Sequence, residues 1–382
     1  MYWILVITTA VLLLAYCVLI LVYRQWFLRL PLFKREESLQ ARTRFSIIIP
    51  ARNEEENIAQ CLRSVLAQNY SKELFEIIVI NDHSTDQTET IIRSLQAQHD
   101  NLRLLNLADH LEGKQLNAYK KKAIEFAISQ SKGNWIVTTD ADCTVTNEWL
   151  NMYDAFIQQN DAVFVAAPVM FTNDGSFLAV FQLLDFISLQ GITAAAVSAG
   201  HHTMCNGANI AYRKDVFYEA GEFKGIDKVA SGDDMLLMYK IKQKYPAQMG
   251  YLYAHESIVV TAPMGDWKSF LNQRIRWASK TANYQDKGIF WTLALVYAVN
   301  FLLLVLLVWS PFVNKGWNNW LLLVLAKTLI ELAFMLPVAR FYKQVQALPW
   351  FPVMQVFHIL YTVVAGWLGK FGTYQWKGRK VH

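Results

Sequence analysis

A run of 22 residues without a charged side chain, Tyr2–Tyr23, constrains this chain more than any other feature of its sequence. About 20 apolar residues in a helix are enough to cross a hydrocarbon core of about 30 Å. The basic residues Arg24, Arg29, Lys34 and Arg35 follow this run. A cleaved signal peptide has the opposite order, with its basic residues first. We therefore expect residues 1–24 to be an uncleaved anchor, with the chain that follows held in the cytoplasm by the positive-inside rule.

Apolar sequence returns near the C-terminal end. The only charged residues from Ile289 to Ala339 are Lys315, Lys327 and Glu331. Asn314–Gly316 makes a natural turn between two spans of about 20 residues each, and a last apolar stretch covers residues 350–368. We expect a membrane region of two or three helices over residues 289–370 and a basic tail over residues 371–382.

The number of crossings determines the side on which the tail lies. Four full crossings would put it opposite the body of the chain, whereas the positive-inside rule favours the cytoplasm. Residues 350–368 contain Gln355 and His358, so we expect this most polar stretch to be re-entrant or interfacial. Lys327 and Glu331 lie four residues apart on one helix face, where they form either a local ion pair or the lining of a path for an acceptor.

The composition excludes several classes of protein. Of 382 residues, 18% are charged and 54% are hydrophobic, whereas soluble globular chains average about 25% charged residues. Disorder, a fibrous repeat and a wholly soluble domain are therefore excluded, and a net charge of +5 is too weak to indicate nucleic-acid binding. The four cysteines have no CxxC spacing, so neither a disulfide framework nor a structural zinc site is expected.

Between the membrane regions, a linker at residues 25–44 leads to a mixed-polarity body at residues 45–288. Short apolar, β-branched runs predict strands at residues 45–49, 75–80, 102–107 and 135–139. Helical spacing predicts helices from residue 58 onward, at 86–98 and at 114–130. This alternation predicts βαβ units, and so an α/β fold with a mostly parallel sheet. Such sheets bind ligands beyond the carboxyl ends of their strands.

Three of the four expected strands end in polar, acid-containing sequences: Pro50–Glu54, Asn81–Asp86 and Asp140–Asp142. The last is a D-x-D sequence, which is either a solvated turn or a ligand pair for Mg²⁺ or Mn²⁺ shared with a diphosphate. Asp82 is placed to accept a hydrogen bond from a base or ribose, and Asp86 to lie in the first turn of the next helix.

Further candidates follow along the chain. Lys114 either neutralises phosphate oxygens or is an exposed helix lysine. Gly207 and Asn209 belong to a small-residue turn that either admits a sugar close to the backbone or is simply tight. Asp233 and Asp234 precede an apolar helix. They either interact with the dipole at the start of that helix or face the crevice, where one of them is a candidate general base.

The last motif lies just before the second membrane region. Gln273, Arg276 and Trp277 lie on one face of an expected interfacial helix, whose composition is otherwise explained by snorkelling arginines. In this arrangement Arg276 is suited to clamp a phosphate and Trp277 to stack on a ring.

In this order, from Phe45 to Trp277, these elements resemble the family 2 membrane glycosyltransferases with the GT-A fold. The resemblance implies that the donor nucleotide contacts the P-x-x-N-E region, Asp82 and the Q-x-x-R-W residues, and that the D-x-D binds a metal-bound diphosphate. It also implies that Asp234 is the catalytic base, with Asp233 beside it. From their place in the sequence, Gly207, Asn209 and Trp277 are expected to face the sugar or the acceptor. The donor-site residues so implied are Pro50, Ala51, Arg52, Asn53, Glu54, Asp82, Lys114, Asp140, Gln273, Arg276 and Trp277, and the metal ligands are Asp140 and Asp142. Asn81 and Asp233 depart from the family pattern, which has Asp and Glu at these places.

The resemblance implies an inverting, metal-dependent glycosyltransferase with Mg²⁺ or Mn²⁺ as cofactor. Its donor would be a nucleotide sugar, by family default a UDP-sugar, and its acceptor a membrane lipid, polyprenyl phosphate or carotenoid. The span count favours a single transfer over a processive polysaccharide synthase. A non-catalytic nucleotide-binding sensor or scaffold is the alternative from another class. We expect an integral protein of a bacterial-type inner membrane, with its catalytic domain in the cytoplasm.

Overall fold

The computed structural model describes residues 1–36, 38–111, 118–227, 232–280, 284–371, 374–376 and 379–381. The chain forms two compact units. The helical unit comprises residues 1–30, 171–202 and 263–374, and the α/β unit comprises residues 31–170, 203–262 and 375–382. The predicted domain at residues 45–288 stays a prediction, because its residues are shared between these two units.

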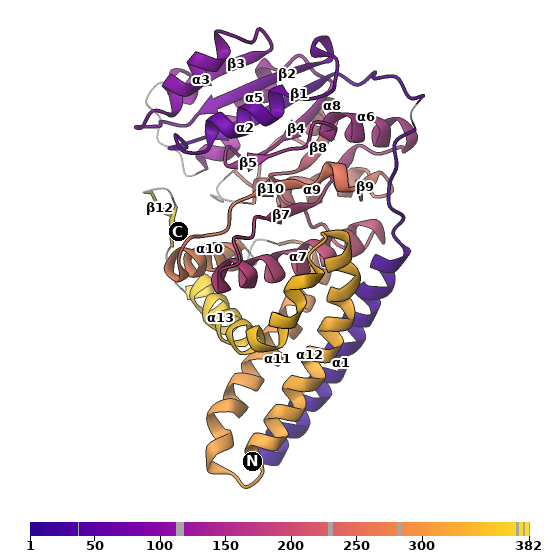
Figure 1. The fold of residues 1–382 in the computed structure, drawn as a ribbon, viewed down its shortest axis with the longest axis vertical. Coiled ribbons are helices and arrows are strands. Elements are labelled where there is room, and N and C mark those ends of the chain that lie inside the picture. Colours follow the sequence, from indigo (N-terminus) through magenta and orange to yellow (C-terminus); the bar gives the residue numbers. More distant parts are fainter. Residues whose placement is uncertain are drawn as a thin grey trace. The chain divides into compact units, whose positions relative to one another are not determined.

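The core of the α/β unit is a seven-stranded sheet of order β3-β2-β1-β4-β8-β6-β9 (Figure 1). Its strands are β1 (Phe45–Ala51), β2 (Phe75–Asn81), β3 (Leu102–Asn106), β4 (Trp135–Thr138), β6 (Phe164–Ala166), β8 (Ile210–Arg213) and β9 (Met249–Tyr251). Strands β3, β2, β1 and β4 are parallel, and β8 runs antiparallel to both β4 and β6. The prediction of an α/β fold with a mostly parallel sheet is confirmed.

Burial on both faces explains why the apolar runs form strands. Ile47, Ile48 and Ile49 of β1 have no exposed surface, as expected for a parallel strand covered on both sides. β1 was predicted to stop before Pro50 but continues to Ala51. Pairing of β1 with β4 ends at Ile48, so the missing N–H of the proline interrupts no ladder on that side.

Helices and short elements complete the α/β unit. The helices are α2 (Ile58–Leu66), η1 (Lys72–Leu74), α3 (Thr88–Gln96), α4 (Leu107–Leu111), α5 (Tyr119–Gln130), α6 (Trp149–Gln159), α8 (Lys214–Glu219), α9 (Asp233–Lys244) and η2 (His255–Ser257). A second sheet contains β5 (Cys143–Thr144), β10 (Val259–Thr261) and β7 (Val169–Phe171), and a two-stranded one contains β11 (Tyr374–Trp376) and β12 (Arg379–Val381). Ile58, Cys61, Leu62 and Val65 bury one face of α2, which is the spacing of an amphipathic helix.

The helical unit contains the apolar segments. Its elements are α1 (Tyr2–Arg29), α7 (Phe177–Ser198), α10 (Trp267–Ser279), α11 (Lys287–Trp309), η4 (Ser310–Phe312), α12 (Gly316–Phe341), η5 (Val345–Trp350) and α13 (Phe351–Phe371). Within the described residues, five helical segments are long and apolar enough to cross a membrane: 2–29, 177–198, 287–312, 316–341 and 345–371. The anchor and the later apolar stretches were expected. α7 was not, because Gln182, Asp185 and Gln190 interrupt its apolar sequence.

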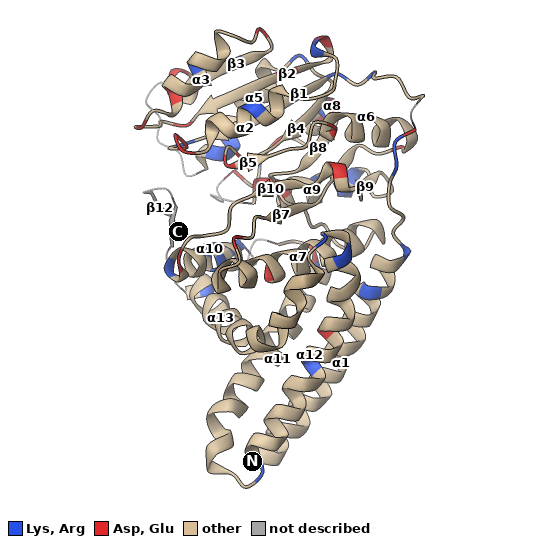
Figure 2. Ribbon diagram, in the orientation of Figure 1, with Lys and Arg blue, Asp and Glu red and all other residues tan. Residues whose placement is uncertain are grey.

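Helices α1 and α12 run parallel. The Tyr2 hydroxyl donates to the Gly316 carbonyl at their starts, and Arg24 donates to the Ala333 carbonyl near their ends. Arg29 and Arg340, in the last turns of these two helices, therefore lie at one end of the unit. Most residues of α1, α11 and α12 are uncharged (Figure 2). Exposed apolar side chains along these helices are suited to contact lipid, which requires no polar partner.

Candidate functional site

The carboxyl ends of β1 and β2 lie side by side. Their residues pair in register up to Ala51 and Asn81, and the backbone N–H of Asp82 donates to the Ala51 carbonyl at 2.8 Å. β4 pairs with the other edge of β1 and is followed by Asp140 and Asp142. The P-x-x-N-E region, the strand-two acid and the D-x-D therefore all leave adjacent strands at the same edge of the sheet.

Hydrogen bonds join the loops that follow β1 and β2. A guanidinium nitrogen of Arg52, Nη1, donates to the carbonyls of Asp82 and His83 at 2.8 and 3.2 Å. The side-chain oxygen of Asn53 accepts from the backbone N–H of Thr85 at 2.9 Å. Arg52 and Asn53 thus hold the strand-two loop, which is a positioning role that their motif alone did not indicate.

Asp86 fixes the start of α3. Its carboxylate accepts hydrogen bonds from the backbone N–H and the hydroxyl of Thr88 at 3.0 and 2.6 Å, and from the backbone N–H of Glu55 at 3.1 Å. Asp86 was predicted to lie in the first turn of the helix, but α3 begins at Thr88, two residues later. Burial acts to raise the pKa of Asp86, but the hydrogen bonds from Thr88 and Glu55 outweigh it and lower that pKa below its usual value.

Lys120, in the first turn of α5, joins two of the predicted acid motifs. Its ammonium nitrogen lies 2.8 Å from Asp140 Oδ1 and 3.4 Å from Asp233 Oδ2. Burial acts to lower the pKa of Lys120, but the charges of Asp140 and Asp233 outweigh it and raise that pKa above its usual range. Lys120 is therefore charged at neutral pH and brings the D-x-D and the Asp233–Asp234 pair to one cation.

Sequence reasoning selected Lys114 in place of Lys120. Lys114 lies outside the described residues, so its role stays a prediction. Lys120–Lys122 are three consecutive lysines, and the next two are bound elsewhere: Lys121 donates to the Ile226 carbonyl, and Lys122 contacts Glu125. Helical spacing does not reveal which of the three faces the acids.

Asp234 is held by the backbone at the start of α9. Its two carboxylate oxygens accept from the backbone N–H groups of Gly207 at 3.0 Å and Met235 at 2.7 Å. A Cβ built on Gly207 would lie 3.4 Å from the Cβ of Asp234 and 3.6 Å from a carboxylate oxygen of Asp233. Such a Cβ would make only ordinary van der Waals contact with both acids, so packing does not require glycine here, and the approach of a sugar to this backbone stays a prediction.

Asn209, predicted to face the acceptor, has no exposed surface. Its side-chain oxygen accepts from the Trp149 indole and the Tyr153 hydroxyl, and its side-chain nitrogen donates to the carbonyls of Pro168 and Ser257. All the hydrogen-bonding capacity of this amide is therefore used inside the protein. We assign Asn209 a structural role and leave it out of the proposed site.

Two buried thiols lie against the D-x-D and were missed by sequence reasoning. Cys143 Sγ donates to Asp142 Oδ1 at 3.5 Å, and Cys61 Sγ donates to the Asp140 carbonyl at 3.6 Å. Burial, together with the charges of Asp142 and Asp140, raises the pKa of both thiols. They are therefore neutral donors at physiological pH, and no spacing in the sequence distinguishes them from core cysteines.

The oxygen ligands of the D-x-D fit a hard divalent cation such as Mg²⁺ or Mn²⁺. In the described part of the chain, no group of three or more His, Cys, Asp or Glu side chains is arranged to hold a metal ion. Asp140 and Asp142 alone would leave most of the coordination shell of such an ion open. The residues present therefore fit a cation that takes its other ligands from a diphosphate and water.

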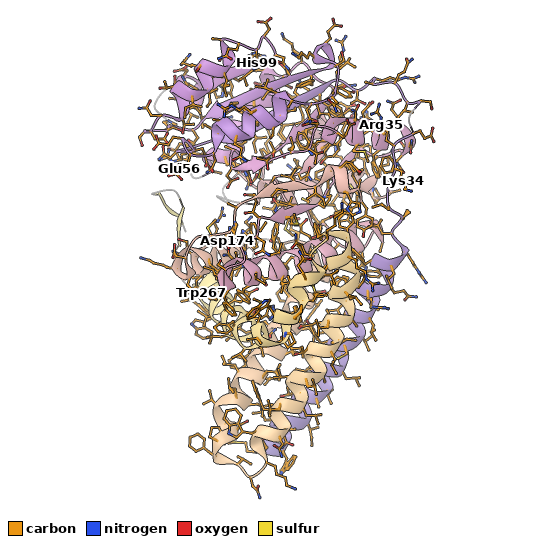
Figure 3. All side chains as sticks on the ribbon, viewed as in Figure 1. Lys34, Arg35, Glu56, His99, Asp174 and Trp267 are labelled. Carbon is orange, nitrogen blue, oxygen red and sulfur yellow. The ribbon has the colours of Figure 1, made fainter. Side chains whose placement is uncertain are left out.

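The Q-x-x-R-W motif lies on α10 in the helical unit. Arg274, which is buried, donates to the Gln273 side-chain oxygen at 2.8 Å, and its guanidinium carbon lies 4.2 Å from the centroid of the Trp277 ring. Asp185 on α7 accepts from Arg274 at 3.0 Å. At the start of α10, the Trp267 side chain lies at the surface of the helical unit (Figure 3). Arg274, which occupies an unspecified position of the Q-x-x-R-W motif, thus contacts both Gln273 and Trp277.

Residues 46–221 match the model of the family described as Glycosyl transferase family 2, and residues 135–368, more than half of the chain, match that of Glycosyl transferase family group 2. This chain is a family 2 glycosyltransferase. The family expected from the D-x-D and Q-x-x-R-W motifs is confirmed.

Two relatives illustrate the similarity of this glycosyltransferase to others. Glycosyltransferase AglE of Haloferax volcanii is 29% identical over 213 residues, which are 56% of this chain and 65% of AglE. A poly-beta-1,6-N-acetyl-D-glucosamine synthase of Staphylococcus epidermidis is 28% identical over 258 residues, which are 66% of this chain and 57% of that protein. The chain thus spans less than two thirds of the length of these curated relatives.

Among solved structures, the glycosyltransferase is similar to the mannosyltransferase PcManGT from Pyrobaculum calidifontis, which was solved in complex with GDP-mannose and Mn²⁺. The TM-score is 0.61 at 16% sequence identity, and the match covers 96% of this chain and 99% of PcManGT. This similarity supports the GT-A fold.

Proposed function

We propose that this glycosyltransferase is an inverting, metal-dependent enzyme that moves a sugar from a nucleoside diphosphate donor to a membrane-associated acceptor. The observation that carries the proposal is the position of Lys120 between Asp140 and Asp233. It links the D-x-D, which suits a metal-bound diphosphate, to the acid pair that is suited to act on the acceptor.

In this proposal the sheet edge binds the donor. Asp140 and Asp142 would hold Mg²⁺ or Mn²⁺, which when bound neutralises charge on the leaving diphosphate. Lys120 supplies a second positive charge at the same place. Asp82 is buried at the end of β2, where a strand-end acid is suited to accept from the base or ribose.

We assign the catalytic base to Asp234. Asp233 is in an ion pair with Lys120, whereas the two oxygens of Asp234 are oriented by backbone N–H groups. Asp234 takes the proton of the acceptor hydroxyl while the acceptor oxygen forms a bond to the anomeric carbon. The bond from that carbon to the diphosphate oxygen breaks on the opposite face, which inverts the configuration.

The acceptor is proposed to be a hydroxyl or phosphate of a membrane lipid, because the described residues include five helices long and apolar enough to cross a bilayer. Arg29 and Arg340 at one end of the helical unit favour placing that end at the cytoplasmic face. A second candidate, a processive polysaccharide synthase, has specific support in the similarity to the staphylococcal poly-N-acetylglucosamine synthase.

The decisive experiment supplies membranes containing the protein with labelled UDP- and GDP-sugars, with and without Mn²⁺, and separates lipid from polymer. We expect metal-dependent label in the lipid fraction. Asp234→Asn should reduce transfer about 10²-fold or more, as the loss of a general base does. The matched control Asp161→Asn changes an exposed acid that accepts from Gln248 and should leave transfer unchanged.

Each other result has a distinct meaning. Label in polymer would favour the processive synthase, and full activity of Asp234→Asn would move the base to Asp233 or defeat the scheme. No transfer from any donor, with nucleotide binding retained, would favour a sensor or scaffold.

A further inference from the structure

His83 has a left-handed backbone conformation directly after the strand-two acid. Its φ is 55°, a region in which a side chain with a Cβ carries a steric cost that glycine does not. Residues held in this way persist when the surrounding structure fixes them, and they gather at functional sites.

The other positive-φ residues help to interpret this one. Among the described non-glycine residues with positive φ, Glu222, Lys315 and Lys343 lie at or near helix ends. Glu222 and Lys343 follow the C-terminal ends of α8 and α12, where the left-handed region serves to terminate a helix, and Lys315 is the N-cap of α12. Asn53 and His83 instead follow the sheet strands that form the candidate site, so helix termination does not explain them.

The imidazole of His83 is fixed by its neighbours. Its Nδ1 lies 2.9 Å from Asp82 Oδ1, and its ring meets that of Tyr119 edge to face, with centroids 5.7 Å apart. Arg52 holds the carbonyls of both Asp82 and His83. The strained backbone thus places a ring between the strand-two acid and the residue before Lys120.

The hydrogen bond to Asp82 also sets the chemistry of the ring. An ionised carboxylate is an acceptor only, so Nδ1 carries the proton in this contact. Nε2 is then an acceptor in the neutral ring and a donor in the charged ring. Asp82 is buried while the His83 side chain is 39% exposed, so the histidine extends the polar surface of that acid outward from the sheet edge.

We propose that His83 binds the nucleoside of the donor, with its Nε2 hydrogen-bonding to the base or ribose beside Asp82. The inference rests on the proposed function, because it names a residue that binds the nucleotide required by this function. The diphosphate lies with Lys120 and the D-x-D in that function, so His83 acts on the nucleoside alone.

The test measures binding of UDP, GDP and inorganic pyrophosphate, each with Mn²⁺, to the purified full-length chain and to His83→Gly. We expect the better-bound nucleotide to lose about threefold to tenfold in affinity, the range for one hydrogen bond between neutral groups. Pyrophosphate has no nucleoside, so its affinity should not change. The melting temperature should not fall, because glycine relieves the left-handed backbone.

Two further variants protect this test. Glu222→Gly makes the same backbone change at the same φ of 55°, away from the sheet edge, and should alter no affinity. His83→Asn keeps a side chain that tolerates the left-handed region but lacks Nε2, so it should weaken nucleotide binding as His83→Gly does.

The outcomes separate the inference from the proposed function. If the unmodified protein binds UDP or GDP and the His83 variants bind them equally well, His83 does not bind the nucleoside. A lowered melting temperature in both His83 variants, or equal losses for pyrophosphate and nucleotide, would assign His83 a structural role and also overturn the inference. If the unmodified protein binds neither nucleotide, the proposed function fails and the inference fails with it.

Discussion

Each unit of the molecule contains a buried or partly buried lysine in an ion pair, with one carboxylate in the helical unit and two in the α/β unit, and the two clusters differ in exposure. In the helical unit Lys327 has no exposed surface, lies 2.7 Å from Glu331 and donates to the Gln355 side-chain oxygen at 2.9 Å. Gln355 in turn donates to Glu331 at 2.6 Å, and Tyr16 donates to the same carboxylate. In the α/β unit, 23% of the Lys120 side chain is exposed.

The charge balance also differs. Lys327 and Glu331 neutralise each other, and the surrounding polar groups satisfy both inside the protein. Lys120 is one cation between the carboxylates of Asp140 and Asp233, so its cluster keeps net negative charge. A closed, neutral cluster holds helices together, whereas an open, negative one attracts a further cation. Of the two alternatives for Lys327 and Glu331, the local ion pair is observed.

The largest expected effect comes from breaking the closed cluster. Glu331→Ala leaves the Lys327 ammonium buried without its counter-charge, which should lower the free energy of unfolding by about 3–5 kcal/mol. Denaturant unfolding in detergent micelles measures this change. The double variant Lys327→Met with Glu331→Met removes both charges and should recover most of the loss. A single variant as stable as the unmodified protein would contradict the assignment of a closed cluster.

The open cluster should respond in the opposite way. Lys120→Met should change the free energy of unfolding by less than about 1 kcal/mol, because partly exposed ion pairs contribute little. It should weaken nucleoside diphosphate binding about tenfold or more, the loss expected for a hydrogen bond to a charged group. Lys122→Met is the matched control, since Lys122 lies on the same helix and contacts Glu125. A variant that unfolds readily but binds donor normally would reverse the comparison.

The pH dependence of Lys120 sharpens this prediction. Its pKa is raised in the folded protein above the usual value of 10.5. Its contribution to stability is therefore fully present below that value and is lost only as pH rises through the higher, folded-state pKa. The small effect of Lys120→Met on unfolding should be the same at pH 6.5 and pH 9. A change between these values would show that the ammonium titrates in this range.

The smallest effect concerns a carboxylate at the same sheet edge that is already satisfied. Asp86→Ala removes the acceptor for Thr88 and Glu55, which should cost about 1 kcal/mol, as the loss of a helix cap does. The pKa of Asp86 is lowered by folding, so its contribution is present at neutral pH and disappears as pH falls through that pKa. Unfolding at pH 7 and pH 3 measures the difference, and nucleotide affinity should be unchanged. An equal cost at both pH values would contradict the role of the charge.

Much of the fold could be predicted because burial leaves a clear signal in sequence. Ile47–Ile49 and Ile77–Ile80 are buried on both faces of a parallel sheet, and such strands are continuous apolar runs. The acids that follow these strands could be predicted because each polar sequence begins where an apolar run stops. α7 could not, since its polar residues have partners inside the helical unit: Asp185 accepts from Arg274 of α10, and Gln182 exchanges hydrogen bonds with the backbone of Met264 before α10.

The residues that were missed depend on three-dimensional neighbours. Lys120 follows Tyr119 in a run of lysines, and the positions of Asp140 and Asp233 give it a role. Asn209 was predicted to face the sugar or the acceptor from its place in a small-residue turn, yet four buried groups already bond its amide. The left-handed backbone of His83 has no sequence signal, because histidine occurs in many conformations. Spacing identifies candidates for a site, and their partners decide what each one does.

The order of the units along the chain has a practical consequence for making this enzyme. Residues 171–202 belong to the helical unit but lie between two parts of the α/β unit. A shortened gene covering residues 31–262 would still encode α7, but without the helices that bury it. The apolar surface exposed in this way promotes aggregation. Preparing a water-soluble form of the α/β unit would therefore require replacing that insert with a short polar linker as well as trimming both ends.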